Sequence, residues 1–243
     1  MTARWQRLLW PVLFAWTSVV DATPPELADL SLIEVPAGNT TASNQTALAI
    51  LLTGDGGWAR IDRALSAQLA ASGIPVVGFD SLHYFWKART PEETAADVAR
   101  TMKHYMEAWS RRQVLLIGYS LGADVLPFIV NRLPADLRDH VCTIVLIGLS
   151  DTAIFQLQLK HWLPSNKRAG QPVAPELAKL TPSRLLCLYG ADEQDSLCPS
   201  LARTGARIER IGSGHHLGGE YSEVAQRIVA TSRCPSTPGK AVE

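Results

Sequence analysis

The sequence predicts an α/β fold organised around a mostly parallel, doubly wound sheet. Apolar runs of strand length alternate with segments of helical spacing, an order that implies right-handed crossovers between parallel strands. One run, residues 114–117, leads directly into Gly118-Tyr119-Ser120-Leu121-Gly122 and is followed by a helical pattern. With 243 residues, 47% of them hydrophobic, the chain is long enough to fill one core. We therefore expect a single domain, at residues 23–243.

The first residues are predicted to be a signal peptide, residues 1–22. Arg4 and Arg7 precede the apolar stretch 8–20, and Val20-Asp21-Ala22 offers the small residues that a signal peptidase reads. The apolar stretch is shorter than the ~20 residues that span a bilayer. We expect an exported mature chain without a transmembrane segment after cleavage.

The balance of charges and the cysteine usage narrow the class of protein. The chain carries 23 basic and 23 acidic side chains, which gives no electrostatic support for nucleic-acid binding. No metal-ligand spacing such as CxxC or HExxH occurs, and we infer no cofactor. Four cysteines in an exported chain can pair in three ways. We expect a Cys187–Cys198 disulfide, with Cys142 and Cys234 as a second pair or as free thiols, and Cys142 can equally be a small buried hydrophobic residue.

Each element has a local signal. The predicted strands are residues 30–35, 47–52, 74–79, 114–117, 142–147, 185–189 and 207–211, and the predicted helices are residues 61–71, 91–110, 123–131 and 220–232. The helix at 91 has a complete capping box, with Thr90 as the cap, Pro91 at the first position and Glu93 three residues on. Between residues 151 and 183 the pattern breaks down into aromatic, basic and proline residues. That segment is predicted to be a short lid-like insertion or, alternatively, an ordinary crossover with a long loop.

The pentapeptide around Ser120 predicts a nucleophile elbow. A strand turning sharply into a helix leaves no room for side chains two residues before and after the nucleophile, and glycine occupies both positions. A serine hydroxyl needs a base, and the base needs an acid to orient it. A hydrolase of this kind therefore requires a carboxylate and a histidine after later strands, in that order.

Both groups are present. Gly190-Ala-Asp-Glu-Gln-Asp195 follows one strand and Gly212-Ser-Gly-His-His216 follows the last. Among the carboxylates Asp195 is preferred, with Asp192 and Glu193 as alternatives; His215 is the preferred base and His216 the alternative. His83, His104, His140 and His161 are interpreted as structural or surface residues.

The oxyanion of the reaction needs preorganised backbone donors. The amide of Leu121 is one candidate, and Asp55 or Gly56 of the glycine-rich loop 53–58 is the second. Aromatic side chains follow strands at the same sheet edge and are predicted to wall an apolar substrate pocket: Trp58, Tyr84, Phe85 and Trp86.

Several motifs together resemble the VirJ/AcvB family of bacterial virulence proteins. They are Thr53-Gly-Asp-Gly-Gly-Trp58, Asp80-Ser-Leu-His-Tyr-Phe-Trp86 with Arg89-Thr-Pro-Glu92, Gly118-Tyr-Ser-Leu-Gly-Ala-Asp-Val-Leu-Pro127, Asn131-Arg-Leu-Pro134, Cys187-Leu-Tyr-Gly190 with Asp195-Ser-Leu-Cys198, and Gly214-His-His216 with Tyr221. Leu121 and Leu217 stand where phenylalanine is expected in relatives, which bears on substrate fit more than on chemistry.

The resemblance implies an α/β-hydrolase fold in the periplasm, with Ser120 as nucleophile, Asp195 as acid and His215 or His216 as base. It also implies hydrolysis of the aminoacyl ester of aminoacyl-phosphatidylglycerol, lysyl or alanyl, through an acyl-serine intermediate. The expected partner is thus a phospholipid head group, or another small ester, at the membrane surface. Basic and aromatic residues of the 151–183 segment could meet such a lipid, namely Lys160, Trp162, Lys167 and Arg168. Asp55 or Asp80 could receive the ammonium group.

Two other functions remain open. One is a non-catalytic adaptor of a type IV secretion or envelope complex, which would bind secretion-system proteins and leave the triad unused. The other is an acyltransferase that uses the same nucleophile with an acceptor other than water.

Overall fold

The computed structural model of the chain describes residues 25–38, 46–157 and 170–232. The predicted signal peptide, Cys234 and the four lipid-facing candidates of the predicted lid (Lys160, Trp162, Lys167 and Arg168) lie outside these ranges. None of the helices within the described ranges has the length and hydropathy of a membrane span.

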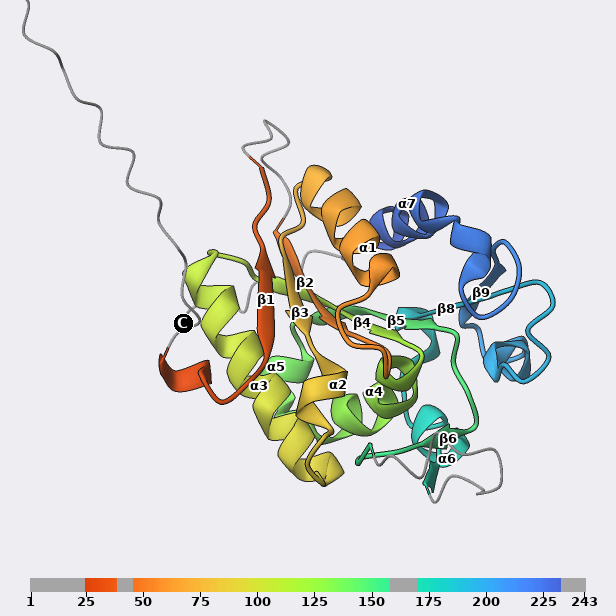
Figure 1. Cartoon of the computed structure of the whole chain (residues 1–243), viewed down its shortest axis with the longest axis horizontal. Coiled ribbons are helices and arrows are strands. Elements are labelled where there is room, and N and C mark those ends of the chain that lie inside the picture. The colour runs from red at the N-terminus through yellow and green to blue at the C-terminus, as the bar shows by residue number, and fades with distance from the viewer. Residues whose placement is uncertain (1–24, 39–45, 158–169, 233–243) are drawn as a thin grey trace, which may run out of the picture.

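A seven-stranded sheet forms the centre of the molecule, in the order β1-β3-β2-β4-β5-β8-β9 (Figure 1). Its strands are β1 (Leu32–Val35), β2 (Ala47–Leu52), β3 (Val76–Phe79), β4 (Gln113–Tyr119), β5 (Val141–Ile147), β8 (Leu185–Tyr189) and β9 (Arg207–Arg210). Only β1 runs antiparallel to its neighbour, β3. The prediction of a mostly parallel sheet is confirmed.

Helices cover both faces of this sheet (Figure 1). Helices α1 (Arg60–Ala71) and α7 (Tyr221–Thr231) pack on one face, and α3 (Pro91–Ala108) and α4 (Leu121–Arg132) on the other. The predicted capping box of α3 is present, because Thr90 Oγ1 accepts from the Glu93 amide and Glu93 accepts from the Thr90 amide. Strands β2 and β4 are buried along nearly their whole length, which explains their continuous apolar sequence.

The smaller elements lie in the connections. They are η1 (Pro25–Leu27), α2 (Ser81–Tyr84), α5 (Ala135–Arg138), α6 (Ala174–Leu177), η3 (Pro182–Arg184), η4 (Cys198–Leu201) and η5 (Leu217–Gly219). In the predicted lid segment, β6 (Thr152–Ala153) pairs antiparallel with β7 (Gln171–Pro172). The described part of that segment is thus an excursion between β5 and β8.

The strand order places a switch in winding direction at the sheet centre. From β2 the chain moves to β3 on one side, and β4 then lies on the other side of β2. Crevices at such switch points, outside the carboxyl ends of the strands, are where open α/β sheets bind ligands. The glycine-rich loop after β2 and Ser120 after β4 both lie at this point.

Candidate active site

Ser120 occupies a strained turn between β4 and α4. Its φ is 52° and its ψ is −119°, a region that non-glycine residues rarely adopt. A Cβ on Gly118 would lie 2.4 Å from the Gly122 carbonyl oxygen, and one on Gly122 would lie 2.2 Å from that of Leu52. The predicted elbow is therefore present, and close backbone contact explains both glycines.

A chain of hydrogen bonds connects Ser120 to a carboxylate. His215 Nε2 lies 2.8 Å from Ser120 Oγ, and His215 Nδ1 lies 2.5 Å from Glu193 Oε1. The serine comes from the end of β4, the carboxylate from the loop after β8 and the histidine from the loop after β9. This is the connectivity of a serine, base and acid triad.

The preference for Asp195 as the acid is wrong in this structure, and the alternative Glu193 takes its place. A turn after β8 returns Glu193 to the sheet edge, where its other carboxylate oxygen, Oε2, accepts from the Gly190 amide at 3.1 Å. Asp195 lies two residues further on and is exposed. Asp192, the other alternative, accepts a hydrogen bond from the Gly214 amide and so holds the loop that carries His215.

His216, the alternative base, is turned to a different partner. Its Nδ1 lies 2.7 Å from the hydroxyl of Tyr119, the residue just before the nucleophile. The Tyr119 ring also stacks beside His215, with centroids 5.5 Å apart and a tilt of 31°. Tyr119 therefore ties both histidines to the end of β4, a role that the sequence analysis missed.

Charge around His215 favours its protonated form. The hydrogen bond to Glu193 raises the pKa of His215 above its ordinary value, burial opposes this, and the negative charges of Asp124 and Asp55 add to the increase. Burial alone would raise the pKa of Glu193, but the hydrogen bonds from His215 and the Gly190 amide outweigh it and lower that pKa. The pair is therefore suited to form an imidazolium beside a carboxylate.

Gly148 is another residue that the sequence analysis missed. It follows β5 with φ +64°, and a Cβ there would lie 2.7 Å from His215 Cε1 and 3.0 Å from Nδ1. Two residues on, Ser150 donates to Asp124 through its amide at 2.7 Å and through its hydroxyl at 2.8 Å. The loop after β5 thus leaves space for the imidazole and is anchored to the first turn of α4.

Two segments that carry the candidate oxyanion donors adjoin Ser120, namely the start of α4 and the loop after β2. Leu121 is the first residue of α4, where backbone amides have no acceptor within the helix. A Cβ on Gly54 would lie 3.3 Å from Ser120 Cβ, so the loop after β2 touches the nucleophile. The Gly57 amide donates to the Gly54 carbonyl, which leaves Asp55 and Gly56 at the centre of a tight turn.

The predicted aromatic pocket wall is not assembled. Tyr84 and Phe85 are buried in the core, where the Tyr84 hydroxyl donates to Asp97 and Phe85 packs on Phe155. Trp58 lies over β3, because a Cβ on Gly78 would come within 2.4 Å of its ring. Trp86 is 59% exposed. For Tyr84 and Phe85 the prediction is wrong, since buried packing contacts account for both rings.

Asp80, a candidate for binding an ammonium group, is already engaged. Its carboxylate caps α2 and lies 2.7 Å from His83 Nδ1. His104 pairs with Glu26, and His140 Nδ1 lies 2.7 Å from the Arg112 carbonyl oxygen. These three histidines thus have local structural partners, while His161 lies outside the described residues.

The predicted disulfide between Cys187 and Cys198 is present. It joins β8 to η4 and encloses the loop that contains Glu193. Cys142 is also disulfide-bonded, which excludes the alternatives of a free thiol or a plain buried residue there. The proposed partner, Cys234, lies outside the described residues.

Solved structures with the same fold include esterases and a serine hydrolase. Est1E from Butyrivibrio proteoclasticus is 13% identical, with TM-score 0.54, over 83% of this chain and 95% of that one. XC6422 from Xanthomonas campestris is described as an α/β serine hydrolase without a lid. It is 14% identical, with TM-score 0.54, over 85% of this chain and 90% of that one. The esterase domain of a Rhodothermus marinus protein is 17% identical, with TM-score 0.53, over 83% and 98%. At these identities the likeness establishes the α/β-hydrolase fold.

A search of curated protein sequences found no match. The model of the family described as bacterial virulence protein (VirJ) matches residues 46–234, which include every element from β2 to α7. The chain belongs to the VirJ family of bacterial virulence proteins.

Proposed function

We propose that this protein is a periplasmic serine esterase that removes the aminoacyl group from aminoacyl-phosphatidylglycerol. The observation that carries the esterase assignment is the continuous hydrogen-bonded chain from Ser120 through His215 to Glu193. A strained serine, a base and a partly buried carboxylate come from three separate loops, and the packing of the fold does not require them to meet at one point. Nucleophilic catalysis requires that they do.

In the acylation step, Ser120 Oγ attacks the ester carbonyl carbon while His215 Nε2 takes the hydroxyl proton. Glu193 stabilises the imidazolium that forms, and the Leu121 amide with that of Asp55 or Gly56 receives the negative oxygen. The tetrahedral intermediate then expels the glycerol oxygen of the lipid, which takes the proton from His215. An aminoacyl-Ser120 ester remains.

In the deacylation step, a water molecule attacks the aminoacyl-Ser120 carbonyl while His215 accepts one of its protons. The second tetrahedral intermediate releases the amino acid, and the serine oxygen recovers its proton from His215. Each turnover therefore consumes one ester and one water and restores the protein.

The charge of the site supports an acyl group that carries an ammonium ion. The carboxylate of Asp55 acts electrostatically on both His215 and Tyr119, and it makes no hydrogen bond to another described residue. Because Asp80 is held by His83, Asp55 is the better placed of the two candidates. The family resemblance adds the lipid, and the paired cysteines support an oxidising compartment such as the periplasm.

The decisive experiment combines active-site labelling with lipid hydrolysis. A fluorophosphonate probe should label the wild-type protein and not Ser120→Ala, and the wild type should release lysine from lysyl-phosphatidylglycerol vesicles about 10⁵-fold faster than that variant. Absent labelling, or equal labelling of both proteins, would contradict the esterase and favour an adaptor. Labelling without release from lysyl- or alanyl-lipid would retain the esterase and discard this substrate.

A second measurement addresses the ammonium group. Asp55→Asn keeps the backbone amide but removes the charge, so it should lower kcat/KM for an aminoacyl ester about two- to fivefold relative to an uncharged acetyl ester. An equal effect on both esters would contradict charge recognition by Asp55.

A further inference from the structure

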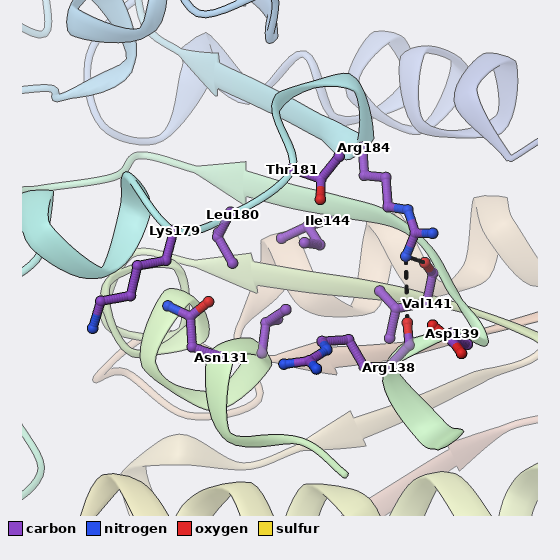
Figure 2. A pocket seen from close by; sticks show the side chains of 10 residues that line it. Asn131, Arg138, Asp139, Val141, Ile144, Lys179, Leu180, Thr181 and Arg184 are labelled. Atoms are coloured by element: carbon purple, nitrogen blue, oxygen red, sulfur yellow. Dashed lines mark hydrogen bonds between the residues drawn. The ribbon is translucent and has the colours of Figure 1, made fainter. Parts of the chain in front are cut away.

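A cavity lies at the edge of the sheet opposite to Ser120. It has a volume of about 290 Å³ and is bounded by the ends of α4 and α5, the start of β5 and the segment that leads from α6 into β8 (Figure 2). This volume is near the lower end of the range for small-molecule sites, about 300–1,000 Å³. Ser120 follows the carboxyl end of β4, whereas this cavity lies beside the amino ends of β5 and β8. It is separate from the catalytic centre by the length of a strand, about 20 Å.

The floor of the cavity is apolar and depends on an irregularity in β5. The register between β4 and β5 shifts, so that Val114 faces Val141 while Leu115 faces Thr143. As a result Val141 and Ile144 both face the α4 side of the sheet, although they are three positions apart. Leu180 and Val130 complete a floor of four buried aliphatic residues.

The rim of the cavity carries an excess of positive charge. Among the described residues that line it, Arg138, Lys179 and Arg184 are basic and only Asp139 is acidic. Lys179 also pairs with Glu176, at 2.8 Å, so the two arginines carry most of the excess. The chain as a whole has no net charge, which makes this local imbalance notable.

The two arginines have different roles. Arg184 Nη1 donates to the Val141 carbonyl at 3.0 Å and to the Arg138 carbonyl at 3.4 Å, which fixes its guanidinium at the mouth of the cavity and leaves the N–H groups of Nη2 and Nε for a ligand (Figure 2). Arg138 is exposed and extends from α5 toward Asn131 (Figure 2). Guanidinium groups bind phosphate and carboxylate groups through paired hydrogen bonds.

We propose that this cavity binds a small amphiphilic anion, in which a phosphate or carboxylate contacts Arg138 and Arg184 and an apolar chain lies on the Val141, Ile144 and Leu180 floor. The cationic rim alone would suit inorganic phosphate, and the floor alone would suit an alcohol. Their juxtaposition selects a molecule with both parts. The site is independent of the esterase mechanism and needs no catalytic residue.

The test measures binding of hexyl phosphate to the protein by calorimetry. One molecule should bind per chain, and affinity should rise about fourfold for each methylene from butyl to hexyl phosphate. Arg138→Gln should weaken binding at least tenfold and Arg138→Lys less. The matched control Arg203→Gln removes an exposed positive charge that does not line the cavity and should change nothing.

Arg138 is exposed, so its variants should retain the melting temperature and the Ser120-dependent activity of the wild type. Absence of saturable binding, equal losses in Arg138→Gln and Arg203→Gln, or equal affinity for hexyl and inorganic phosphate would each overturn the proposal. Competition with phosphatidylglycerol vesicles identifies the source of the ligand. Displacement of hexyl phosphate would indicate a membrane lipid, and its retention would indicate a soluble amphiphile.

Discussion

The two edges of the sheet differ in charge and in backbone conformation. The carboxyl edge gathers Asp55, Asp124, Asp192 and Glu193 around His215, and it holds Ser120 and Gly148 at positive φ. The amino edge carries Arg138 and Arg184 over an aliphatic floor. The carboxyl edge thus concentrates strain and negative charge where a cationic intermediate forms on His215, whereas positive charge exceeds negative charge around the amino-edge cavity. Changes at the carboxyl edge should therefore affect catalysis, and changes at the amino edge should not.

The largest expected effect comes from exchanging the acid. Glu193→Gln should lower kcat roughly 10³- to 10⁴-fold, because the amide can no longer stabilise the imidazolium. Asp195→Asn, the matched control, should change kcat less than threefold. Reversed outcomes in these two variants would restore Asp195 as the acid.

The pH profile gives a second readout of the same pair. His215 must be neutral to accept the serine proton, so activity should rise with pH through the raised pKa of His215. Since the hydrogen bond to Glu193 is the main cause of the increase, the residual activity of Glu193→Gln should rise at lower pH than that of the wild type. If the activity of Glu193→Gln rose at the same pH as that of the wild type, Glu193 would not set the pKa of His215.

The next largest effect on kcat should come from filling the space beside the His215 imidazole. Gly148→Ala places a methyl group 2.7 Å from His215 Cε1, and we expect kcat to fall about 10- to 100-fold through misplacement of the base. Gly205→Ala is the control, because Gly205 also has positive φ, +91°, but open space around its Cβ position. It should lose about 1 kcal/mol of stability and no activity. Equal kcat in both variants would contradict the steric argument.

The buried carboxyl of Asp62, at the start of α1, should affect stability rather than chemistry. Desolvation raises its pKa from 3.8 to about 6, although it caps the Ala59 amide. The folded state therefore keeps a proton that the unfolded state loses, and stability falls as pH rises from about 4 to 6. Asp62→Asn should be more stable than the wild type by roughly 1–3 kcal/mol at pH 8, and not below pH 4.

Chemical denaturation at the two pH values measures this effect, with Asp195→Asn as an exposed control. A gain that is the same at pH 4 and pH 8 would show that ionisation of Asp62 is not its cause.

The smallest expected effect concerns Tyr119. Loss of its hydrogen bond to His216 in Tyr119→Phe should lower kcat about three- to tenfold with KM unchanged. Because the two side chains act as a pair, the double variant with His216→Ala should be no worse than the poorer single variant. Additive losses would show that the two residues act independently.

The sequence was sufficient for the parts of the site that backbone sterics determine. Gly118 and Gly122 mark the elbow because any side chain there collides with neighbouring backbone, and that requirement can be read locally. The acid was ambiguous because three carboxylates occupy four positions, and the choice depends on how the turn at Gly190 folds back. Gly148 could not be predicted, because glycine is required there by the closeness of His215, which is distant in sequence. Short helices such as α2 lack enough residues to show a period.

The Cys187–Cys198 disulfide has a bearing on when the site becomes complete. The two sulfurs close a covalent ring around Glu193, so the orienting carboxylate lies on a segment whose ends cannot separate. In a newly made chain with both thiols reduced, the nucleophile and the base would still be held by their own loops. The loop that carries the Glu193 carboxylate would have more conformational freedom. We therefore expect full hydrolytic activity only after oxidation has joined the two sulfurs, and a poorly activated nucleophile wherever the thiols stay reduced.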